Sequence, residues 1–384
     1  MKTDLFFNAQ VKPDLLTTVP NRDPLEYHRR LPGYNVTPLV DAQAISKNLG
    51  LKKLWVKDES SRLGLPAFKM LGASWAVYRL MQKRLSHPLK PWNTVEQLAV
   101  QFEELRPLTL VTATDGNHGR AVARTARLLG FQAHIFVPAG TAHARIQAIE
   151  GEGATVSVVN GSYDDAVSLA SQQAGERHLV ISDTSWPGYE EVPGYIAEGY
   201  STIFWEIEDE LNRRGEEGPD LALVQVGVGA LAEAMVRYYR CPDRSKETRL
   251  VSVEPLSAAC ALESARAGKL VTVPGPQDSI MAGLNCGTPS LVAWPYMSGG
   301  IDLFLAIDDE RSRQAMRLLA GAGVVSGETG ASGLGGLLEM LQGEHSGEIR
   351  QRLNLTEDSR VLVISTEGAT DPQAYAAITG NKVL

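Results

Sequence analysis

Cysteine is scarce in this 384-residue sequence, which carries only Cys241, Cys260 and Cys286 and has no CxxC pair. The scarcity excludes a disulfide-rich secreted scaffold and the usual cysteine-rich zinc sites, and it predicts a reducing, cytoplasmic compartment. Cys260 and Cys286 could pair if the fold brought them together, although buried free thiols are the simpler expectation. We therefore expect no metal site, and a bridge between those two cysteines stays open.

Long apolar runs are also missing. The longest candidate, LALVQVGVGALAEAMV at 221–236, is interrupted by Gln225 and Glu233, and no run approaches the roughly 20 residues of a membrane-spanning helix. The opening residues, MKTDLFFNAQ, lack the apolar core and small-residue cleavage site of a signal peptide. The sequence therefore predicts a protein without a membrane partner.

An excess of basic residues is absent too: 37 Lys and Arg stand against 45 Asp and Glu, for a net charge of −8. This balance argues against nucleic acid or an anionic membrane surface as the main partner. The apolar content of 43% and the charged content of 21% are those of an ordinary globular protein, and the length suggests about two domains.

What the sequence does contain is an alternation of short apolar runs and longer helical patterns, such as Gly119–Leu129 and Ile196–Arg213. This alternation is typical of an α/β protein whose parallel sheet is covered on both faces. A small domain at 89–188, inserted into a large one made of 1–88 and 189–384, would create a cleft for small-molecule chemistry. The predicted strands are Lys53–Val56, Thr109–Ala113, Ala133–Val137, Thr155–Val159, Leu179–Ser182, Leu221–Val226, Leu250–Glu254 and Val361–Ser365.

The stretch PAFKMLGASWAVYRL, at 66–80, contains a lysine in an unusual position. Leu71, Trp75 and Tyr78 recur at helical spacing, which predicts an amphipathic helix with Lys69 in its opening turn. The lysine could simply run along the helix and reach water with its amine. Alternatively, the positive helix end and the apolar neighbours lower the pKa of the amine, which could then condense with an aldehyde.

A polar, glycine-punctuated loop follows the predicted strand Thr109–Ala113. In TATDGNHGRAVA, at 112–123, either Asp115 or Asn117 could merely cap the next helix. The functional interpretation is that backbone N–H groups at this helix entrance bind a carboxylate. Asn117 would then donate to a ring hydroxyl, and Asp115 would supply an acid or a base.

A glycine-rich turn follows a later strand, in VQVGVGALAEA at 224–234. Gly227, Gly229 and Ala232 fit the G-x-G-x-x-[G/A] spacing of a phosphate cradle at a helix N-terminus. The glycines could instead serve only close packing of helix and sheet. Glu254, which ends the next predicted strand, stands about where a ribose-binding acid would, so a nicotinamide cofactor stays open.

The last predicted strand, in VLVISTEGATD at 361–371, ends in the hydroxyl side chains of Ser365 and Thr366. These hydroxyls could do no more than end the strand. Together with the other three stretches, however, they supply a neutral hydroxyl for a ring nitrogen beside an amine nucleophile, an asparagine for a ring oxygen and a phosphate cradle. One ligand uses all four features: pyridoxal 5′-phosphate.

In this order, the motifs resemble those of the fold-type II pyridoxal-phosphate enzymes, the group of threonine dehydratase and tryptophan synthase β, over nearly the whole chain. The closest resemblance within that group is to the diaminopropionate ammonia-lyases. It implies two open, twisted, mostly parallel sheets with helices on both faces, bound pyridoxal phosphate and usually a homodimer. The residues that carry it are AFKMLGAS (67–74), ATDGNHGRAVA (113–123), SDTSWPGYEEVPGYIAEGY (182–200), VGVGALA (226–232), IMAGLNCGTPS (280–290) and ISTEGATDP (364–372).

The resemblance also implies a role for each matched residue. Lys69 would bond covalently to the cofactor, Asn117 would contact its ring oxygen, and Ser365 or Thr366 would face its ring nitrogen. The phosphate would be held by Gly227, Val228, Gly229, Ala230 and Leu231. The substrate would be contacted by Thr114, Asp115, Gly116, His118 and Asp183.

The implied reaction is β-elimination of ammonia from 2,3-diaminopropionate, which yields pyruvate and two molecules of ammonia. Lys69 would remove the Cα proton of the L-isomer and Asp115 that of the D-isomer, because the two enantiomers present this proton to opposite faces. The β-ammonium calls for a carboxylate, from Asp115 or Asp183, although Asp183 could instead be a local cap. Dehydratases of the group usually carry a small hydroxyl or neutral residue in place of Asp115, which argues against plain dehydration.

Three other functions stay in competition. A serine or threonine dehydratase would use the same fold on a different substrate. A nicotinamide-dependent dehydrogenase would use the Gly227–Ala232 turn, but it would leave Lys69 and the Gly-Asn-His-Gly loop unexplained. A non-catalytic protein could keep the fold, bind pyridoxal phosphate and make no pyruvate.

Overall fold

The computed structural model describes residues 2–114, 116–161, 163–242 and 247–382, and the chain divides into two compact units. The larger unit is made of Met1–Asn21, Val36–Ser61 and Ile203–Leu384, and the smaller one of Arg22–Asn35 and Arg62–Thr202. Each unit contains one sheet. The strands of the small sheet all lie within 89–188, and the division into a domain at 89–188 and one formed by 1–88 and 189–384 stays a prediction.

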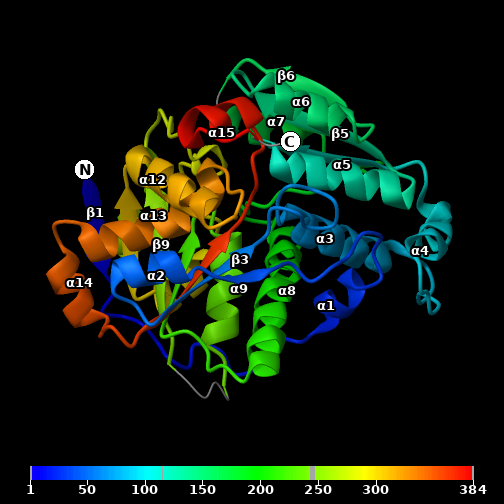
Figure 1. The fold of residues 1–384 in the computed structure, drawn as a ribbon. Helices are drawn as coiled ribbons and strands as arrows, with labels where there is room; N and C mark the ends of the chain where they lie inside the picture. The colour runs from blue at the N-terminus through cyan, green and yellow to red at the C-terminus, as the bar shows by residue number, and fades with distance from the viewer. Residues whose placement is uncertain (1, 115, 162, 243–246, 383–384) are drawn as a thin grey trace. The chain divides into compact units, whose positions relative to one another are not determined.

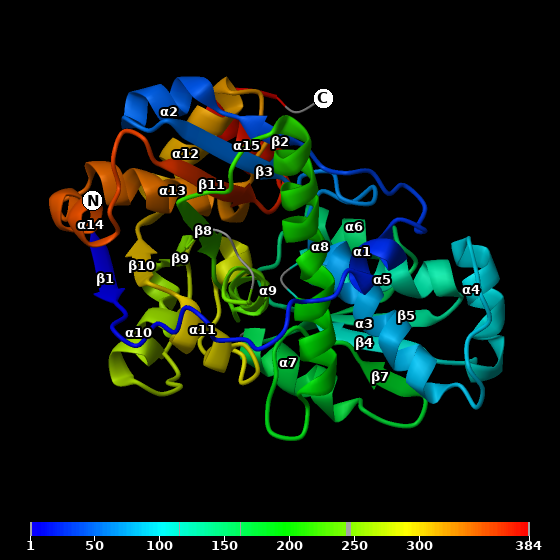
Figure 2. The ribbon, with the colours of Figure 1, turned by 90° about the horizontal axis from the view of Figure 1, so that it is seen from below.

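The larger unit is organised around a seven-stranded sheet, in which β1 and β2 form antiparallel edges and the other neighbouring strands run parallel (Figure 2). Two of its inner strands, β8 and β10, are mainly apolar and are buried along their whole length, as expected for strands covered on both faces. In sheet order the strands are β1 (Thr3–Phe7), β10 (Leu303–Ile307), β9 (Arg249–Pro255), β8 (Leu221–Gln225), β11 (Arg360–Ser365), β3 (Lys53–Asp58) and β2 (Leu39–Asp41).

Helix α13 (Glu328–Gln342) lies against one face of the large sheet, within the main apolar core. Its glycines permit a close approach: a Cβ atom on Gly336 would stand 2.5 Å from Cγ2 of Val253 on β9. Helix α9 (Ala230–Tyr239) follows directly after β8 and a glycine turn. The turn therefore emerges at the carboxyl edge of the sheet, which is the usual position of ligand sites in such sheets.

The smaller unit holds a parallel four-stranded sheet in the order β6 (Thr155–Val159), β5 (Gln132–Pro138), β4 (Thr109–Ala113), β7 (His178–Val180). Helices α5 (Asn117–Leu129) and α7 (Tyr163–Gln172) cover this sheet (Figure 1). Ile135 of β5 meets α5 at Gly119, whereas the next residue, Phe136, packs in one cluster with Ala166 of α7. Because successive strand residues point to opposite faces, the two helices cover opposite sides.

The other helices connect or flank these layers. No helix among residues 2–114, 116–161, 163–242 and 247–382 is long and apolar enough to cross a bilayer. The remaining helices are α1 (Asp23–His28), α2 (Gln43–Leu49), α3 (Lys69–Arg84), α4 (Val95–Gln101), α6 (His143–Glu150), α8 (Glu191–Arg214), α10 (Cys260–Ala267), α11 (Trp294–Gly300), α12 (Asp309–Gly321), α14 (Ser346–Arg352), α15 (Pro372–Thr379), and the short 3₁₀ turns Glu103–Leu105, Leu256–Ala258 and Ala282–Leu284.

The predicted α/β class with two mostly parallel sheets is confirmed. Each of the eight predicted strands is present, with ends shifted by at most two residues. The prediction omitted β1, β2 and β10. Strands β1 and β2 are short antiparallel edges, and the apolar run of β10 is too short for its periodicity to separate a strand from a helix. All three cysteines are thiols in the structure.

Candidate active site

Lys69 is the first residue of α3, and its amine meets a carboxylate. The Nζ atom lies 2.7 Å from Oδ2 of Asp183, a residue 114 positions later in the chain. The Lys69 side chain is 22% exposed and that of Asp183 is 8% exposed. The amine therefore has a carboxylate partner in addition to the apolar neighbours expected from the sequence. The Phe68 ring does lie 5.4 Å from the amine, but a buried charge opposes it from another segment.

Asp183 follows β7 at the carboxyl end of the small sheet, and its carboxylate is buried. Burial raises the pKa of Asp183, but the charges of Lys69 and then His118 outweigh burial, so the pKa falls from 3.8 to about 2. Nδ1 of His118 lies 4.0 Å from the same oxygen atom. Asp183 is thus an ionised acceptor for ammonium groups at any pH at which enzymes usually work.

His118, the second residue of α5, is tied to the same strand end as Asp183. Its Nε2 atom lies 2.7 Å from the carbonyl oxygen of Ile181, two residues before Asp183. Because a carbonyl oxygen can only accept, this nitrogen must carry a proton. The bond fixes the plane of the imidazole ring relative to the carboxylate.

The Thr114 side chain fixes the backbone of the Gly-Asn-His-Gly segment, at 116–119. The Thr114 Oγ1 atom accepts the N–H groups of Gly116, at 2.9 Å, and Gly119, at 3.0 Å. The N–H of Gly116, which we expected to contact the substrate, is therefore engaged within the protein. A Cβ atom on Gly119 would stand 2.3 Å from Thr114 Cγ2, so only glycine fits that position. Asn117 is half-buried at the start of α5, and Asp115 lies outside the described residues.

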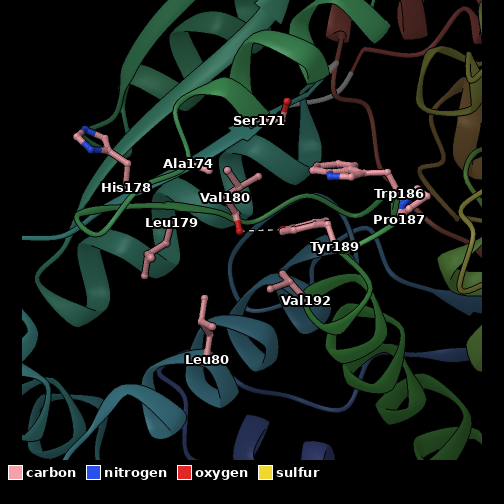
Figure 3. Close-up of a pocket in the computed structure, with 12 residues that line it drawn as sticks. Leu80, Ser171, Ala174, His178, Leu179, Val180, Trp186, Pro187, Tyr189 and Val192 are labelled. Atoms are coloured by element: carbon pink, nitrogen blue, oxygen red, sulfur yellow. Dashed lines mark hydrogen bonds between the residues drawn. The ribbon is translucent and has the colours of Figure 1, made fainter.

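A cavity of about 450 Å³ is lined by β7 and by the segment that follows it, including Trp186 and Tyr189 (Figure 3). Tyr189, in its wall, donates its hydroxyl to the carbonyl oxygen of Val180 at 2.8 Å and accepts the N–H of Ser182 at 3.0 Å. Trp186 stacks on the Tyr189 ring at 4.3 Å. None of the predicted site residues lines this cavity. Its wall instead supports the backbone from which Asp183 projects.

In the larger unit, the glycine turn has the shape of an anion cradle. Gly229 adopts φ 100°, a left-handed conformation that favours glycine, and α9 begins at the next residue, Ala230. A Cβ atom on Gly227 would stand 2.9 Å from the carbonyl oxygen of Gly283, so the turn also lies too close to its neighbour for a side chain. The first N–H groups of a helix have no partner within the helix and attract anions.

The predicted hydroxyl pair lies beside this turn in the same sheet. Val363 of β11 is in register with Leu223 of β8, so both strands end at the same edge. Ser365 and Thr366 are buried, and the Ser365 hydroxyl donates to Oγ of Ser326 at 2.8 Å. The structure therefore places the glycine turn and both hydroxyls at one edge of the large sheet.

Gln225 also lies at this edge of the large sheet. The sequence indicated it only as an interruption of an apolar run and did not predict it as a site residue. Its side-chain amide donates to Oγ1 of Thr366 at 3.3 Å and to the carbonyl oxygen of Ile364 at 2.9 Å, which ties β8 to the end of β11. The available signal was a polar residue inside the apolar run LALVQVGVGA, at 221–230. Such a residue is expected to have buried hydrogen-bond partners.

Glu254 is not a ribose-binding acid, and the structure corrects that expectation. Its two carboxylate oxygens accept the N–H groups of Ala261 at 2.7 Å and Leu262 at 2.8 Å, at the start of α10. The side chain is completely buried, and burial raises the pKa of Glu254 to about 8. Glu254 therefore caps a helix, and the dehydrogenase interpretation loses its acidic residue.

Comparison with known proteins identifies the family of this chain. The family described as "Pyridoxal-phosphate dependent enzyme" matches residues 30–367. The chain belongs to this family. A member from Salmonella typhimurium, named diaminopropionate ammonia-lyase, is 36% identical over 93% of this chain and 91% of its own. The Escherichia coli protein of the same name is 35% identical over 97% and 94%.

Solved structures of pyridoxal-phosphate-dependent enzymes share the whole fold. Diaminopropionate ammonia lyase from E. coli, in complex with D-serine, superposes with a TM-score of 0.90 at 34% identity and covers 98% of this chain and 97% of that one. A threonine deaminase from Solanum lycopersicum superposes with a TM-score of 0.71 at 20% identity, which shows a common fold only. The fold-type II architecture and the pyridoxal-phosphate cofactor predicted from the sequence are thus confirmed.

Proposed function

We propose that this pyridoxal-phosphate-dependent enzyme eliminates ammonia from 2,3-diaminopropionate and releases pyruvate and two molecules of ammonia. The observation that carries the proposal is the 36% identity to a diaminopropionate ammonia-lyase over 93% of the chain. The pair of Lys69 and Asp183 supports it, because a buried, ionised carboxylate beside an amine suits a substrate with two amino groups. Serine and threonine carry no β-ammonium that would need such a partner.

The chain's own residues fit the cofactor. The tight turn of Gly227 and Gly229, with the start of α9, suits a phosphate, and buried neutral hydroxyls suit a pyridine nitrogen. In this proposal the phosphate is held by Gly227, Val228, Gly229, Ala230 and Leu231, the ring oxygen by Asn117 and the ring nitrogen by Ser365 or Thr366. When bound, pyridoxal phosphate supplies a ring that stabilises negative charge at the substrate Cα atom.

Lys69 would hold the cofactor covalently and, as a free amine, would take the Cα proton of the L-isomer. Asp183, which holds the Lys69 ammonium at 2.7 Å in the structure, would then receive the β-ammonium of the substrate. His118 would keep that carboxylate in place. Thr114 would shape the loop by holding the N–H of Gly116, and Gly116 and the first turn of α5 would lie against the substrate carboxylate, with the N–H groups of α5 as donors. Asp115 would act on the D-isomer from the opposite face.

Three finer features belong to the same proposal. The enzyme is proposed to work in the cytoplasm, given its few cysteines, and as a homodimer, by analogy with its group. Residues 89–188 are proposed as a domain inserted into one formed by 1–88 and 189–384. Light scattering of the purified protein gives its oligomeric state, and a monomer at working concentration would contradict the dimer.

A substrate panel tests the reaction. The purified protein with pyridoxal phosphate is given D- and L-2,3-diaminopropionate, serine and threonine, and keto acid and ammonia are measured. We expect pyruvate and ammonia in a ratio of 1:2 from diaminopropionate, with a kcat/KM at least about a hundredfold above that for serine. A reversed preference would establish the dehydratase. No keto acid from any of the four, with the cofactor bound, would indicate a non-catalytic protein.

The dehydratase is the second candidate because a rat protein named L-serine dehydratase/L-threonine deaminase is 28% identical over 62% of this chain. This likeness is weaker in both identity and coverage than that to the ammonia-lyases. Dehydration releases one ammonia per keto acid, so the ratio of the two products separates the two reactions.

A further inference from the structure

Helices α3 and α8 touch directly beside Lys69, and two glycines make this contact possible. A Cβ atom on Gly199 of α8 would stand 2.5 Å from the carbonyl oxygen of Leu71. A Cβ atom on Gly72 of α3 would stand 2.6 Å from Cε1 of Tyr200. Neither position accepts a side chain. The ring of Tyr200 therefore lies against the first turn of α3, the turn that begins with Lys69.

The Tyr200 ring is held from a second side as well. The Phe68 ring, which belongs to the residue directly before Lys69, lies with its centroid 4.6 Å from that of Tyr200. Tyr200 is completely buried. Its hydroxyl has no hydrogen-bond partner among the described residues of the chain. Leaving a buried hydroxyl unpaired destabilises the folded protein, so such a group calls for a functional explanation.

Two charged side chains, those of Lys69 and Asp183, act on this hydroxyl. Burial raises the pKa of the Tyr200 phenol; the nearby charge of Lys69 lowers this pKa, and that of Asp183 raises it again. Tyr200 is thus a neutral phenol within electrostatic reach of both members of the ion pair. A phenol can donate and accept a hydrogen bond, whereas the Asp183 carboxylate can only accept.

We propose that Tyr200 is a positioning residue for Lys69: its hydroxyl has no partner in the described part of the chain while Asp183 holds the charged amine, and it donates a hydrogen bond to the neutral amine. The ionised Asp183 stabilises only the charged form of Lys69. The neutral form is the nucleophile that bonds to an aldehyde, and it needs a donor to hold its lone pair in place. The inference rests on Lys69 as the cofactor-bonding residue and not on the identity of the substrate.

The test compares Tyr200→Phe with a matched control, Tyr27→Phe. Tyr27 is also buried beside α3, with burial raising its pKa, but its hydroxyl donates to the carbonyl oxygen of Ser74 at 3.1 Å. Cofactor-free protein is mixed with pyridoxal phosphate, and the rate constant of binding is followed by absorbance. The unfolding temperature of each cofactor-free protein is measured alongside.

We expect Tyr200→Phe to bind the cofactor about tenfold more slowly, with an unfolding temperature equal to or above that of the wild type, because no existing hydrogen bond is removed. Tyr27→Phe should lower the unfolding temperature by about 2 °C and leave the binding rate unchanged. A wild-type binding rate in Tyr200→Phe, or a loss of stability as large as that of the control, overturns the proposal. The substrate is tested separately. If the wild type makes no pyruvate from diaminopropionate but Tyr200→Phe still binds the cofactor slowly, the proposed substrate is wrong and the role of Tyr200 stands.

Discussion

The predicted site residues of the two units differ in the kind of chemistry they offer. In the smaller unit they are charged: Lys69 faces Asp183, with His118 close by. In the larger unit they are a glycine turn with backbone N–H groups and two buried neutral hydroxyls. Groups that move protons must change charge, whereas a phosphate and a ring are held best by fixed dipoles that do not titrate.

Two buried carboxyl groups, one in each unit, sharpen this contrast. Asp183 and Glu254 are both shielded from water, yet the pKa of Asp183 is lowered to about 2 and that of Glu254 is raised to about 8. Asp183 faces a cation, whereas Glu254 meets uncharged donors, the N–H groups of Ala261 and Leu262 and the Cys260 thiol. Burial alone therefore does not decide the charge of a carboxyl group; its partner does.

Replacing the amine should have the largest effect. Lys69→Ala removes the nucleophile, so we expect loss of covalently bound cofactor, seen by absorbance, and a fall in pyruvate formation on the order of a thousandfold or more. Lys69→Arg is the control, because it keeps a cation opposite Asp183 but cannot form the bond. An Ala variant that still binds pyridoxal phosphate covalently and turns over would contradict the assignment of Lys69.

The second effect concerns the two faces of the substrate. Asp115→Asn removes a base without changing shape, and we expect kcat/KM for D-2,3-diaminopropionate to fall about a hundredfold while that for the L-isomer changes little. Steady-state kinetics on each isomer measures this difference. Equal losses for both isomers would mean that one base serves both faces.

The third effect is on stability and tests the charge of Asp183. Because the pKa of Asp183 is lowered from 3.8 to about 2 on folding, its contribution is present above pH 4 and is lost as the pH falls towards 2. The contribution amounts to about 2 kcal/mol in the free energy of unfolding. Denaturant unfolding between pH 2 and pH 5 should show this loss in the wild type.

The same measurement on two variants isolates Asp183 from other acids. Asp183→Asn should lack the loss of about 2 kcal/mol, whereas Asp14→Asn, at an exposed position, should keep it. An unchanged pH dependence in Asp183→Asn would show that Lys69 and His118 do not hold this carboxylate in its ionised form.

The smallest effect belongs to the glycine turn. Gly229→Ala forces a side chain into φ 100°, and strain of about 1–2 kcal/mol should weaken pyridoxal-phosphate binding about tenfold, measured by titration of the cofactor-free protein. Gly268→Ala, at φ 67° with open space around it at the C-terminal end of α10, carries a similar strain at a residue that is not part of the turn. It should lower stability but leave cofactor affinity unchanged; equal losses of affinity would remove the turn from the cofactor site.

Sequence reasoning succeeded where the signal is local. The strand Thr109–Ala113 was predicted with its observed ends, and the turn with Gly227 and Gly229 was predicted between a strand and a helix, because periodicity and turn chemistry act within a few residues. It failed where partners are distant. The residues next to Lys69 in the chain do not indicate that its amine pairs with Asp183. Likewise, the residues next to Glu254 do not distinguish a ribose-binding acid from the cap of α10.

Local residue patterns were enough to predict the alternation of strands and helices, the glycine turn before α9 and the position of Lys69 at the start of α3. The contacts between distant side chains emerged only with the fold: Asp183 opposite Lys69, Gln225 on Thr366, and the Tyr200 hydroxyl buried beside α3. The two kinds of feature differ in range. Backbone preferences are set by neighbouring residues, whereas a pKa or a buried hydrogen bond depends on side chains that the order of the strands brings together from far along the chain.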